Sequence, residues 1–226
     1  EKLVKDIRSF WKILKEIPFD LYRCIGLLSE NGWTGVTLKH KFTRKLTGAV
    51  TQQLRLDHDI SQVDQLFTEG GVEYEAKKNF KISFNYRFIN KNEDTYYSKS
   101  HRLYADVSYK YKPTRFAFTI RERIQEEYTS INSSETGKVP EWALRSKFGI
   151  SYDTERRYKP YVSYEVYYLI HNAKSDPSGI NRMRYSSGVE YEFNRIHSID
   201  FGLIFQDDLY NQRNSFIYSV GYTYTL

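Results

Sequence analysis

The chain of 226 residues has little cysteine, methionine or proline. Its one cysteine, Cys24, excludes an internal disulfide, and its five prolines leave long stretches in which no residue breaks a strand. No window approaches ~18 consecutive apolar residues, which excludes a membrane-spanning helix. The chain begins at Glu1 and shows no secretion signal, so we expect any export signal to have been removed.

No region of the sequence is dominated by charges of one sign. The chain holds 34 basic and 28 acidic residues, for a net charge of +6, and the two signs are mixed along the sequence. This mixture lacks the clustered basic surface that binds nucleic acid, so we expect no nucleic-acid partner. Aromatic residues are abundant instead, since 21 tyrosines and 14 phenylalanines favour β-strands.

Residues 1–31 differ from the rest and are expected to form a helix and lead-in before a barrel domain of residues 32–226. Apolar residues recur there at three- and four-residue steps as far as Pro18, with basic residues between them, which predicts an amphipathic helix. Such a helix docks on a membrane surface or a partner, plugs a lumen, or packs as an ordinary helix on the protein itself. The apolar docking face comprises Phe10, Trp11 and Leu14.

From Trp33 onward, apolar residues recur at every second position. In residues 80–88 phenylalanine, isoleucine and tyrosine alternate with lysine, serine, asparagine and arginine, which is the pattern of a strand with one apolar face. We expect about eleven strands. They lie at residues 33–43, 46–58, 65–77, 79–91, 99–112, 114–128, 141–155, 158–171, 180–194, 196–208 and 214–226.

The expected strands are long, and their connections alternate in length. Most strands span roughly ten residues or more, whereas strands average ~5–6 residues in soluble proteins and ~9–11 in membranes. Short turns such as 43–45 and 77–78 alternate with longer connections such as 90–98 and 129–140, which is typical of an outer-membrane barrel. A soluble sandwich or lipocalin-like barrel with its apolar face inward fits the same alternation. Strand length and aromatic residues near strand ends favour the membrane barrel.

The number of strands is less well defined by the sequence. Single-chain bacterial barrels have even strand numbers, so a twelfth strand at about residues 19–29 is the simplest addition, and a ten-stranded barrel is the alternative. Because its following turn is short, the strand at 33–43 should run from the outside toward the periplasm. The sequence thus predicts an all-β, antiparallel up-and-down transmembrane barrel of about 12 strands with an N-terminal amphipathic helix.

The polar residues of the alternating pairs should face the lumen, where opposite charges lie on neighbouring strands within reach of one another. They line a charged pore for ions and small solutes, or they fill the interior with salt bridges. Because the signs interleave, the filled lumen is favoured. The expected lumen charge network comprises Glu69, Glu73, Glu75, Lys81, Arg87, Arg102, Asp106, Lys110, Arg145, Lys147, Glu165, Arg184, Glu190 and Glu192.

Candidate catalytic residues are few. His101 lies near Ser98 and Ser100, so that the histidine would supply a base and a serine the nucleophile. His197 is adjacent to Ser198, but neighbouring residues of a strand point to opposite faces. The five histidines also lack the spacing of a metal site. We therefore expect no catalytic site, no metal and no other cofactor.

Four strand segments resemble a known family. They read NGWTGVTL (31–38), KLTGAVTQQLRL (45–56), FTEGGVEY (67–74) and KISFNYRF (81–88). These segments resemble the DUF2490 family of Bacteroidota outer-membrane proteins, and the resemblance extends over residues 31–226. It implies an outer-membrane barrel without an assigned activity, so it identifies no catalytic residues. Residues 1–31 depart from the family pattern.

The sequence therefore predicts a non-enzymatic barrel of the bacterial outer membrane. We expect it to be a structural or accessory subunit of an outer-membrane assembly, with the lipid bilayer and other proteins of a membrane complex as its partners. A porin-like channel that passes small solutes or ions through the charged lumen is the first alternative. A lipid-modifying enzyme of the outer membrane is the second.

Overall fold

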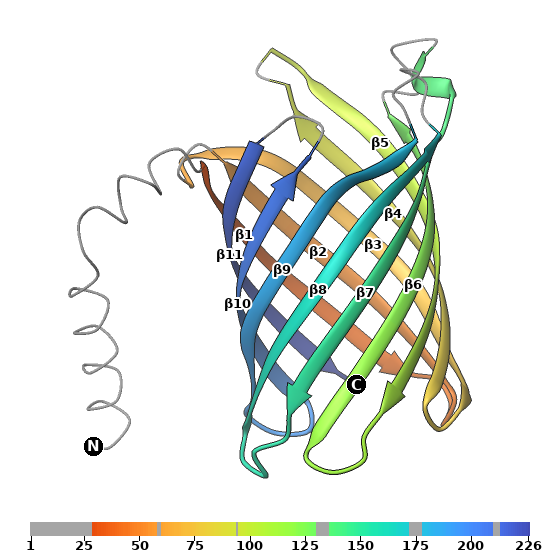
Figure 1. Ribbon diagram of the computed structural model, residues 1–226, viewed down its shortest axis with the longest axis vertical. Coiled ribbons are helices and arrows are strands. Elements are labelled where there is room, and N and C mark those ends of the chain that lie inside the picture. The colour runs from red at the N-terminus through yellow and green to blue at the C-terminus, as the bar shows by residue number, and fades with distance from the viewer. Residues whose placement is uncertain (1–28, 58–59, 94, 130–135, 172–177, 210–212) are drawn as a thin grey trace, which may run out of the picture.

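In the computed structural model the strands form one closed ring (Figure 1). The structure describes residues 29–57, 60–93, 95–129, 136–171, 178–209 and 213–226. The strands are β1 (Ser29–Lys41), β2 (Leu46–Asp57), β3 (Gln62–Lys77), β4 (Phe80–Asn92), β5 (Tyr97–Tyr111), β6 (Phe116–Thr129), β7 (Glu141–Tyr152), β8 (Tyr158–His171), β9 (Gly179–Glu192), β10 (His197–Asp208) and β11 (Arg213–Thr225). A short 3-10 helix, η1 (Thr136–Lys138), precedes β7.

These eleven strands match the eleven expected from the alternation of apolar and polar residues. The largest difference is at β1, which begins at Ser29 rather than at residue 33 and so includes the end of the expected lead-in. The expected amphipathic helix and its docking residues Phe10, Trp11 and Leu14 lie outside the described residues. No helix in the described part of the chain is long and apolar enough to cross a membrane.

Parallel pairing of β1 and β11 closes the ring, while all other neighbouring strands are antiparallel. Within the described residues the wall therefore has eleven strands, not the twelve or ten that the sequence suggested. The even-number expectation fails because an odd set of alternating strands ends in the direction in which it began, and a parallel ladder can then join the two ends. Residues 19–28, most of the segment expected to form a twelfth strand, lie outside the description.

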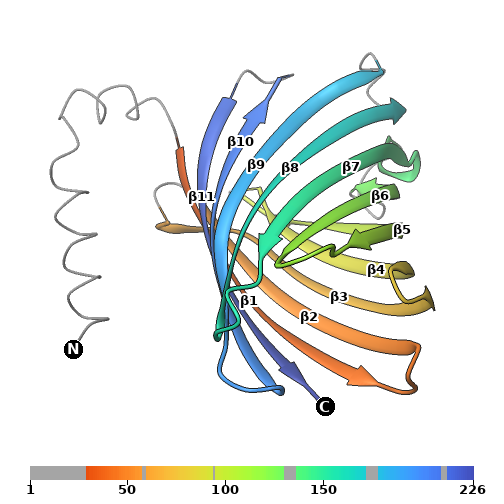
Figure 2. The ribbon, with the colours of Figure 1, turned by 60° about the horizontal axis from the view of Figure 1, so that its bottom comes forward.

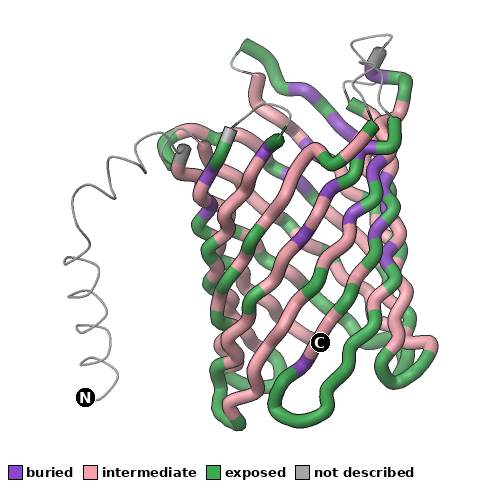
Figure 3. Tube along the Cα trace, in the orientation of Figure 1, coloured by how far each residue is buried: buried purple, intermediate pink, exposed green. Residues whose placement is uncertain are grey.

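The outer face of the barrel is apolar and the inner face is charged. Paired residues of neighbouring strands share a face, and one such set exposes large apolar side chains, among them Phe84, Val107 and Val220. The opposite set includes Arg123 and Glu165, which are only 7% and 6% exposed. Figure 3 shows most of the buried positions in the upper part of the wall. A soluble barrel would have the reverse arrangement. The structure thus has a transmembrane-type β-barrel fold, in which the apolar outer face contacts lipid and the closed ring satisfies the backbone.

The two rims of the barrel differ. Turns 42–45, 78–79, 112–115, 153–157 and 193–196 form one rim, here called the turn rim, and the strand ends at the opposite side form the loop rim (Figures 1 and 2). At the turn rim Lys112 Nζ donates to Asp153 Oδ2 over 2.6 Å and lowers the pKa of that carboxyl. At the loop rim, residues 93–96 replace the expected loop 90–98, because β4 and β5 extend into it.

Candidate functional site

A cavity of about 620 Å³ lies inside the barrel, toward the loop rim. Residues from β1 through β9 line it, so it belongs to the lumen rather than to the outer wall. Most of its charged side chains are basic. The basic ones are Arg55, Arg87, Lys91, Arg102, Arg121, Arg123, Arg145, Arg182 and Arg184, and the acidic ones are Glu69, Glu127 and Glu141.

Six of these arginines pair with a carboxylate. The bidentate pair is the most regular, since Arg123 donates from Nε and Nη2 to the two oxygens of Asp106 over 2.6 and 2.7 Å. Arg145 and Arg121 share Glu165. The remaining pairs are Arg87 with Glu69 at 2.5 Å, Arg102 with Glu127 at 2.5 Å and Arg182 with Asp208 at 2.9 Å. Charge-assisted pairs of this kind hold arginine side chains in fixed positions on the wall.

Aromatic side chains alternate with arginines around the same level of the lumen, forming a belt. Arg123 lies 3.7 Å from the ring centre of Tyr104, and Arg87 lies 3.9 Å from that of Phe67. Across the barrel, Arg145 lies 4.2 Å from the ring of Tyr167. The full order of the belt is Arg123, Tyr104, Arg87, Phe67, Arg55, Trp33, Arg184, Tyr167 and Arg145. Cation–π contact adds to the ion pairs in holding the guanidinium groups.

Two arginines of the belt, Arg55 and Arg184, pair with no carboxylate of the described residues. Arg55 Nη1 donates to the neutral Gln65 amide oxygen at 3.3 Å, and Arg55 Nε is buried without a partner in the described structure. Arg184 donates to Gln206 over 2.7 Å and to the Tyr167 hydroxyl. Both guanidinium carbons approach the Trp33 ring centre, at 4.0 and 5.1 Å. The belt therefore concentrates uncompensated positive charge at Trp33.

Small residues on the strands between β1 and β8 leave space beside Trp33. Register places Trp33 opposite Ser219, which in turn faces Gly202 and then Gly188 across β10 and β9. A Cβ on Gly188 would lie 2.5 Å from the Tyr161 hydroxyl, so Tyr161 can occupy its position only because residue 188 has no side chain. The row of small residues thus accommodates two large aromatic side chains, one at each of its ends.

The lumen toward the turn rim is built from lysines and acidic residues. Lys81 contacts Glu73 at 2.6 Å and Lys159 contacts Glu192 at 2.5 Å. The Tyr161 hydroxyl donates to Asp200 Oδ1 over 3.0 Å. The two ion pairs of this half each join one lysine to one glutamate, in contrast to the arginine-rich cavity.

All fourteen residues expected in the lumen charge network lie on the inner face, since each belongs to the register of the charged set. The structure pairs Glu69 with Arg87, Glu73 with Lys81, and Arg145 with Glu165. Other members pair with residues that the sequence analysis did not single out. These are Arg102 with Glu127, Asp106 with Arg123, Glu165 with Arg121, and Glu192 with Lys159. Five members make no side-chain ion pair within the described residues, namely Glu75, Lys110, Lys147, Arg184 and Glu190.

Sequence reasoning missed the strongest part of the site. Arg55, Arg121 and Arg123 were not among the expected lumen residues, although the alternation in β2 and β6 places them on the inner face. For β6 the signal is the outward set Phe118, Ile120 and Ile124, which forces the intervening arginines inward. The aromatic members of the belt carried no comparable signal, because tyrosines and phenylalanines occur on both faces of this chain.

The candidate catalytic pairs are divided between the two faces. The outward His101 hydrogen-bonds the Tyr86 hydroxyl at 2.7 Å, whereas Ser100 is an inward, buried side chain. His197 bonds the Tyr222 hydroxyl at 2.6 Å, and strand alternation places Ser198 on the other face. Among the described residues there is no group of three or more His, Cys, Asp or Glu side chains that would hold a metal ion.

The chain belongs to the family described as protein of unknown function (DUF2490), whose model matches residues 30–217. No curated protein sequence matches it. Similar solved structures include the translocator domain of the autotransporter NalP from Neisseria meningitidis, at 9% identity and a TM-score of 0.42, covering 77% of this chain and 72% of that one. LpxR from Salmonella typhimurium is 6% identical with a TM-score of 0.48, covering 80% of this chain and 83% of its own. Similarity at this level carries no argument about function.

Proposed function

We propose that this chain is a non-enzymatic barrel of the bacterial outer membrane that passes small anions through its lumen. The observation that carries the proposal is the composition of the cavity wall, on which eight arginines and Lys91 face three glutamates. The partners Asp106, Glu165 and Asp208, with Glu93 for Lys91, reduce this excess of positive charge without removing it. Rings of arginine and lysine attract anions into a pore, and the low-dielectric wall strengthens the attraction.

The excess of arginine favours a pore over the filled interior that the sequence suggested. In a filled interior, each buried charge needs a partner of opposite sign. In this lumen Arg55 and Arg184 face the cavity with neutral hydrogen-bond partners only, within the described residues. Mobile anions would supply the missing negative charge.

The membrane setting follows from the outer wall. Large apolar side chains such as Phe84, 63% exposed, and Phe201, 51% exposed, are stable only in contact with lipid or another apolar surface. Closed barrels with apolar outer faces occur in bacterial outer membranes. A source in Bacteroidota rests on the sequence resemblance alone.

Ion selectivity tests the proposal directly. The full chain is reconstituted into planar lipid bilayers under a KCl gradient, and the reversal potential is measured. Stepwise currents whose reversal potential is shifted from zero toward the chloride equilibrium potential support the proposal. Lys112→Gln removes a positive charge from an exposed turn and serves as the matched control, which should keep the wild-type selectivity. Silence or cation selectivity would contradict the proposal.

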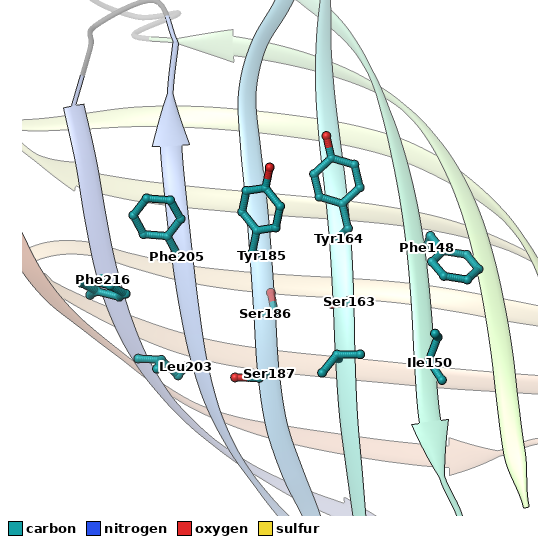
Figure 4. A pocket seen from close by; sticks show the side chains of 11 residues that line it. Phe148, Ile150, Ser163, Tyr164, Tyr185, Ser186, Ser187, Leu203, Phe205 and Phe216 are labelled. Carbon is teal, nitrogen blue, oxygen red and sulfur yellow. The ribbon is translucent and has the colours of Figure 1, made fainter. Parts of the chain in front are cut away.

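A structural or accessory role in an outer-membrane assembly is the second candidate, and one polar pair favours it. Glu122 lies on the outward face between Ile120 and Ile124, and Ser146 Oγ donates to its Oε2 over 2.6 Å. A carboxylate in a lipid-facing wall is costly and marks a contact with a polar group. An apolar hollow of about 430 Å³ lies on the same wall over β7 to β11 (Figure 4). A partner protein covering this wall would contact both.

Copurification separates this candidate from the channel. The tagged chain is isolated from its native membrane in mild detergent, alongside the variant Glu122→Leu. An accessory subunit should carry a stoichiometric partner that the variant loses while its heat-modifiable migration on gels is retained. The matched control Ile120→Leu should keep the partner. A wild-type barrel that purifies alone would contradict the accessory role.

A further inference from the structure

Two arginines of the lumen contact the same Trp33 ring and keep hydrogen-bond donors that no protein group uses within the described residues. Arg55 uses Nη1 for Gln65, and its buried Nε has no acceptor within the described residues, where no bond of Nη2 is found either. Arg184 uses Nε and Nη1 for Gln206 and Tyr167, which leaves Nη2. The two guanidinium carbons lie 4.0 and 5.1 Å from the centre of the Trp33 ring. The two guanidinium carbons therefore lie no more than about 9 Å apart, the sum of these two distances.

The other six arginines of the cavity differ from Arg55 and Arg184 because each has a carboxylate partner. Each of the six others contacts a carboxylate at an ion-pair distance, for example Arg123 with Asp106 at 2.6 Å. An arginine fork binds an oxyanion through two parallel N–H···O bonds, and the Nε–Nη2 edge is suited to this geometry. A protein carboxylate occupies this position at Arg123, where Nε and Nη2 both donate to Asp106. At Arg55 the Nε of the same edge is buried and has no acceptor within the described residues.

The electrostatics of the pair also require an anion. Two positive charges beside one ring repel each other, and the repulsion is stronger in a lumen than in bulk water. The Trp33 ring contributes only a weak attraction to each cation. The side chains of Gln65 and Gln206 are neutral, so they do not offset this repulsion. An oxyanion bound beside the Trp33 ring would offset the repulsion and accept hydrogen bonds from the open donors.

We propose that Arg55, Arg184 and Trp33 form a binding site for an oxyanion, a carboxylate or phosphate group of a small water-soluble solute. The proposal deepens the anion-conducting function and rests on it for the route by which the solute arrives. The closed wall of hydrogen-bonded strands separates the site from the surrounding lipid, which favours a solute over a lipid headgroup. Trp33 supplies a flat apolar surface beside the charged group.

Binding to the purified full chain tests the site. Inorganic phosphate and, separately, acetate are titrated calorimetrically into the protein in detergent, with chloride as the background anion. We expect saturable binding of at least one oxyanion, weakened by about tenfold or more in Arg55→Gln, as expected for the loss of a charged hydrogen-bonded contact. Arg184→Gln is a second, independent variant with the same expected effect.

Lys91→Gln is the matched control, because it removes one positive charge from the same cavity wall but leaves the Trp33 locality intact. Equal weakening in Lys91→Gln and Arg55→Gln would mean diffuse attraction, and would overturn the site. The absence of saturable binding to both oxyanions would overturn it as well, as would binding of phosphatidylglycerol in mixed micelles without binding of the free anions.

A thermal measurement guards against variants that fail to fold. Because Arg55 is uncompensated, Arg55→Gln should leave the melting temperature unchanged or raised in the absence of oxyanion, and phosphate should no longer raise it. A variant that melts lower and still responds to phosphate would contradict the site. The outcome is separable from that of the proposed function, since oxyanion binding without conductance refutes only the channel, and chloride conductance without oxyanion binding refutes only the site.

Discussion

The two halves of the lumen use different basic residues in different surroundings. Toward the loop rim, arginines form nearly dry pairs, as in Arg145 with Glu165, whose side chains are each 8% exposed. Toward the turn rim, lysines form wet pairs, as in Lys81 with Glu73, whose side chains are 43% and 42% exposed. Arginine suits the first setting because its weakly hydrated fork makes several fixed bonds and stacks on rings. Lysine remains near water, where its compact charge is well hydrated.

The comparison separates charged side chains that hold the structure in place from charged side chains that contribute little to its stability. The arginine half holds the aromatic belt and the open donors at Trp33, so its geometry is fixed by many contacts at once. The lysine half has single, exposed ion pairs and the wedge of Tyr161 on Gly188. Substitutions that break an ion pair should therefore have large effects in the first half and small effects in the second.

The largest expected effect is the loss of a dry pair. Arg123→Met leaves Asp106 buried without its bidentate partner, and breaking such a pair costs about 3–5 kcal/mol. Urea unfolding from lipid vesicles measures the change in the free energy of unfolding. A double variant with Asp106→Asn should recover part of the loss, because no uncompensated charge remains. Full stability of Arg123→Met would refute the structural role of the belt.

The next effect tests the contrast between the inner and outer faces. Val107 faces lipid, and Val107→Arg should cost about 2–4 kcal/mol if it lies near the middle of the membrane. The neighbouring inward residue Ser108 provides the matched control, since Ser108→Arg faces the aqueous lumen. Folding titrations into vesicles measure both. Equal losses in the two variants would contradict the assignment of the faces.

A smaller effect is expected at the glycine that accommodates Tyr161. The Cβ of Gly188→Ala would lie 2.5 Å from the Phe201 carbonyl oxygen and from the Tyr161 hydroxyl, so the strand or the tyrosine must shift. We expect a loss of about 1–3 kcal/mol, the usual cost of overpacking. Gly149→Ala is the control, because its nearest neighbour would be 3.6 Å away. If both variants unfold at the same urea concentration, the packing of Tyr161 against Gly188 has no structural role.

The smallest effect is expected in the lysine half. Lys81→Gln removes the pair with Glu73, and an exposed ion pair contributes only about 0–1 kcal/mol. The urea midpoint in vesicles should therefore stay close to that of the wild type. A loss as large as that of Arg123→Met would show that the two halves do not differ in the way proposed.

The sequence predicted the strands and faces well because both depend on local alternation. Phe84 and Asn85 are adjacent and differ in polarity, and this is enough to place one outside and the other inside. Opposite charges on sequential strands, such as Glu69 and Arg87, were also foreseeable, because neighbouring antiparallel strands pair with each other.

Ring closure and long-range contacts were not foreseeable. Nothing local in β1 or β11 indicates that they pair in parallel, so the closure of the eleven described strands was not predicted. The meeting of Arg55 and Arg184 at Trp33 depends on this closure and on the small residues Ser219 and Gly202 between them. Contacts between β2, β1 and β9 arise from the geometry of the whole ring, which no periodicity within one strand encodes.

The permeability ratio of chloride to potassium in two charge-inverted variants tests the central claim most directly. Arg184→Glu changes the arginine half, and Lys159→Glu changes the lysine half, each by the same amount of charge. Reversal potentials in planar bilayers should show anion selectivity in the wild type and in Lys159→Glu, and its loss or reversal in Arg184→Glu. Selectivity that survives in Arg184→Glu and disappears in Lys159→Glu would contradict the account.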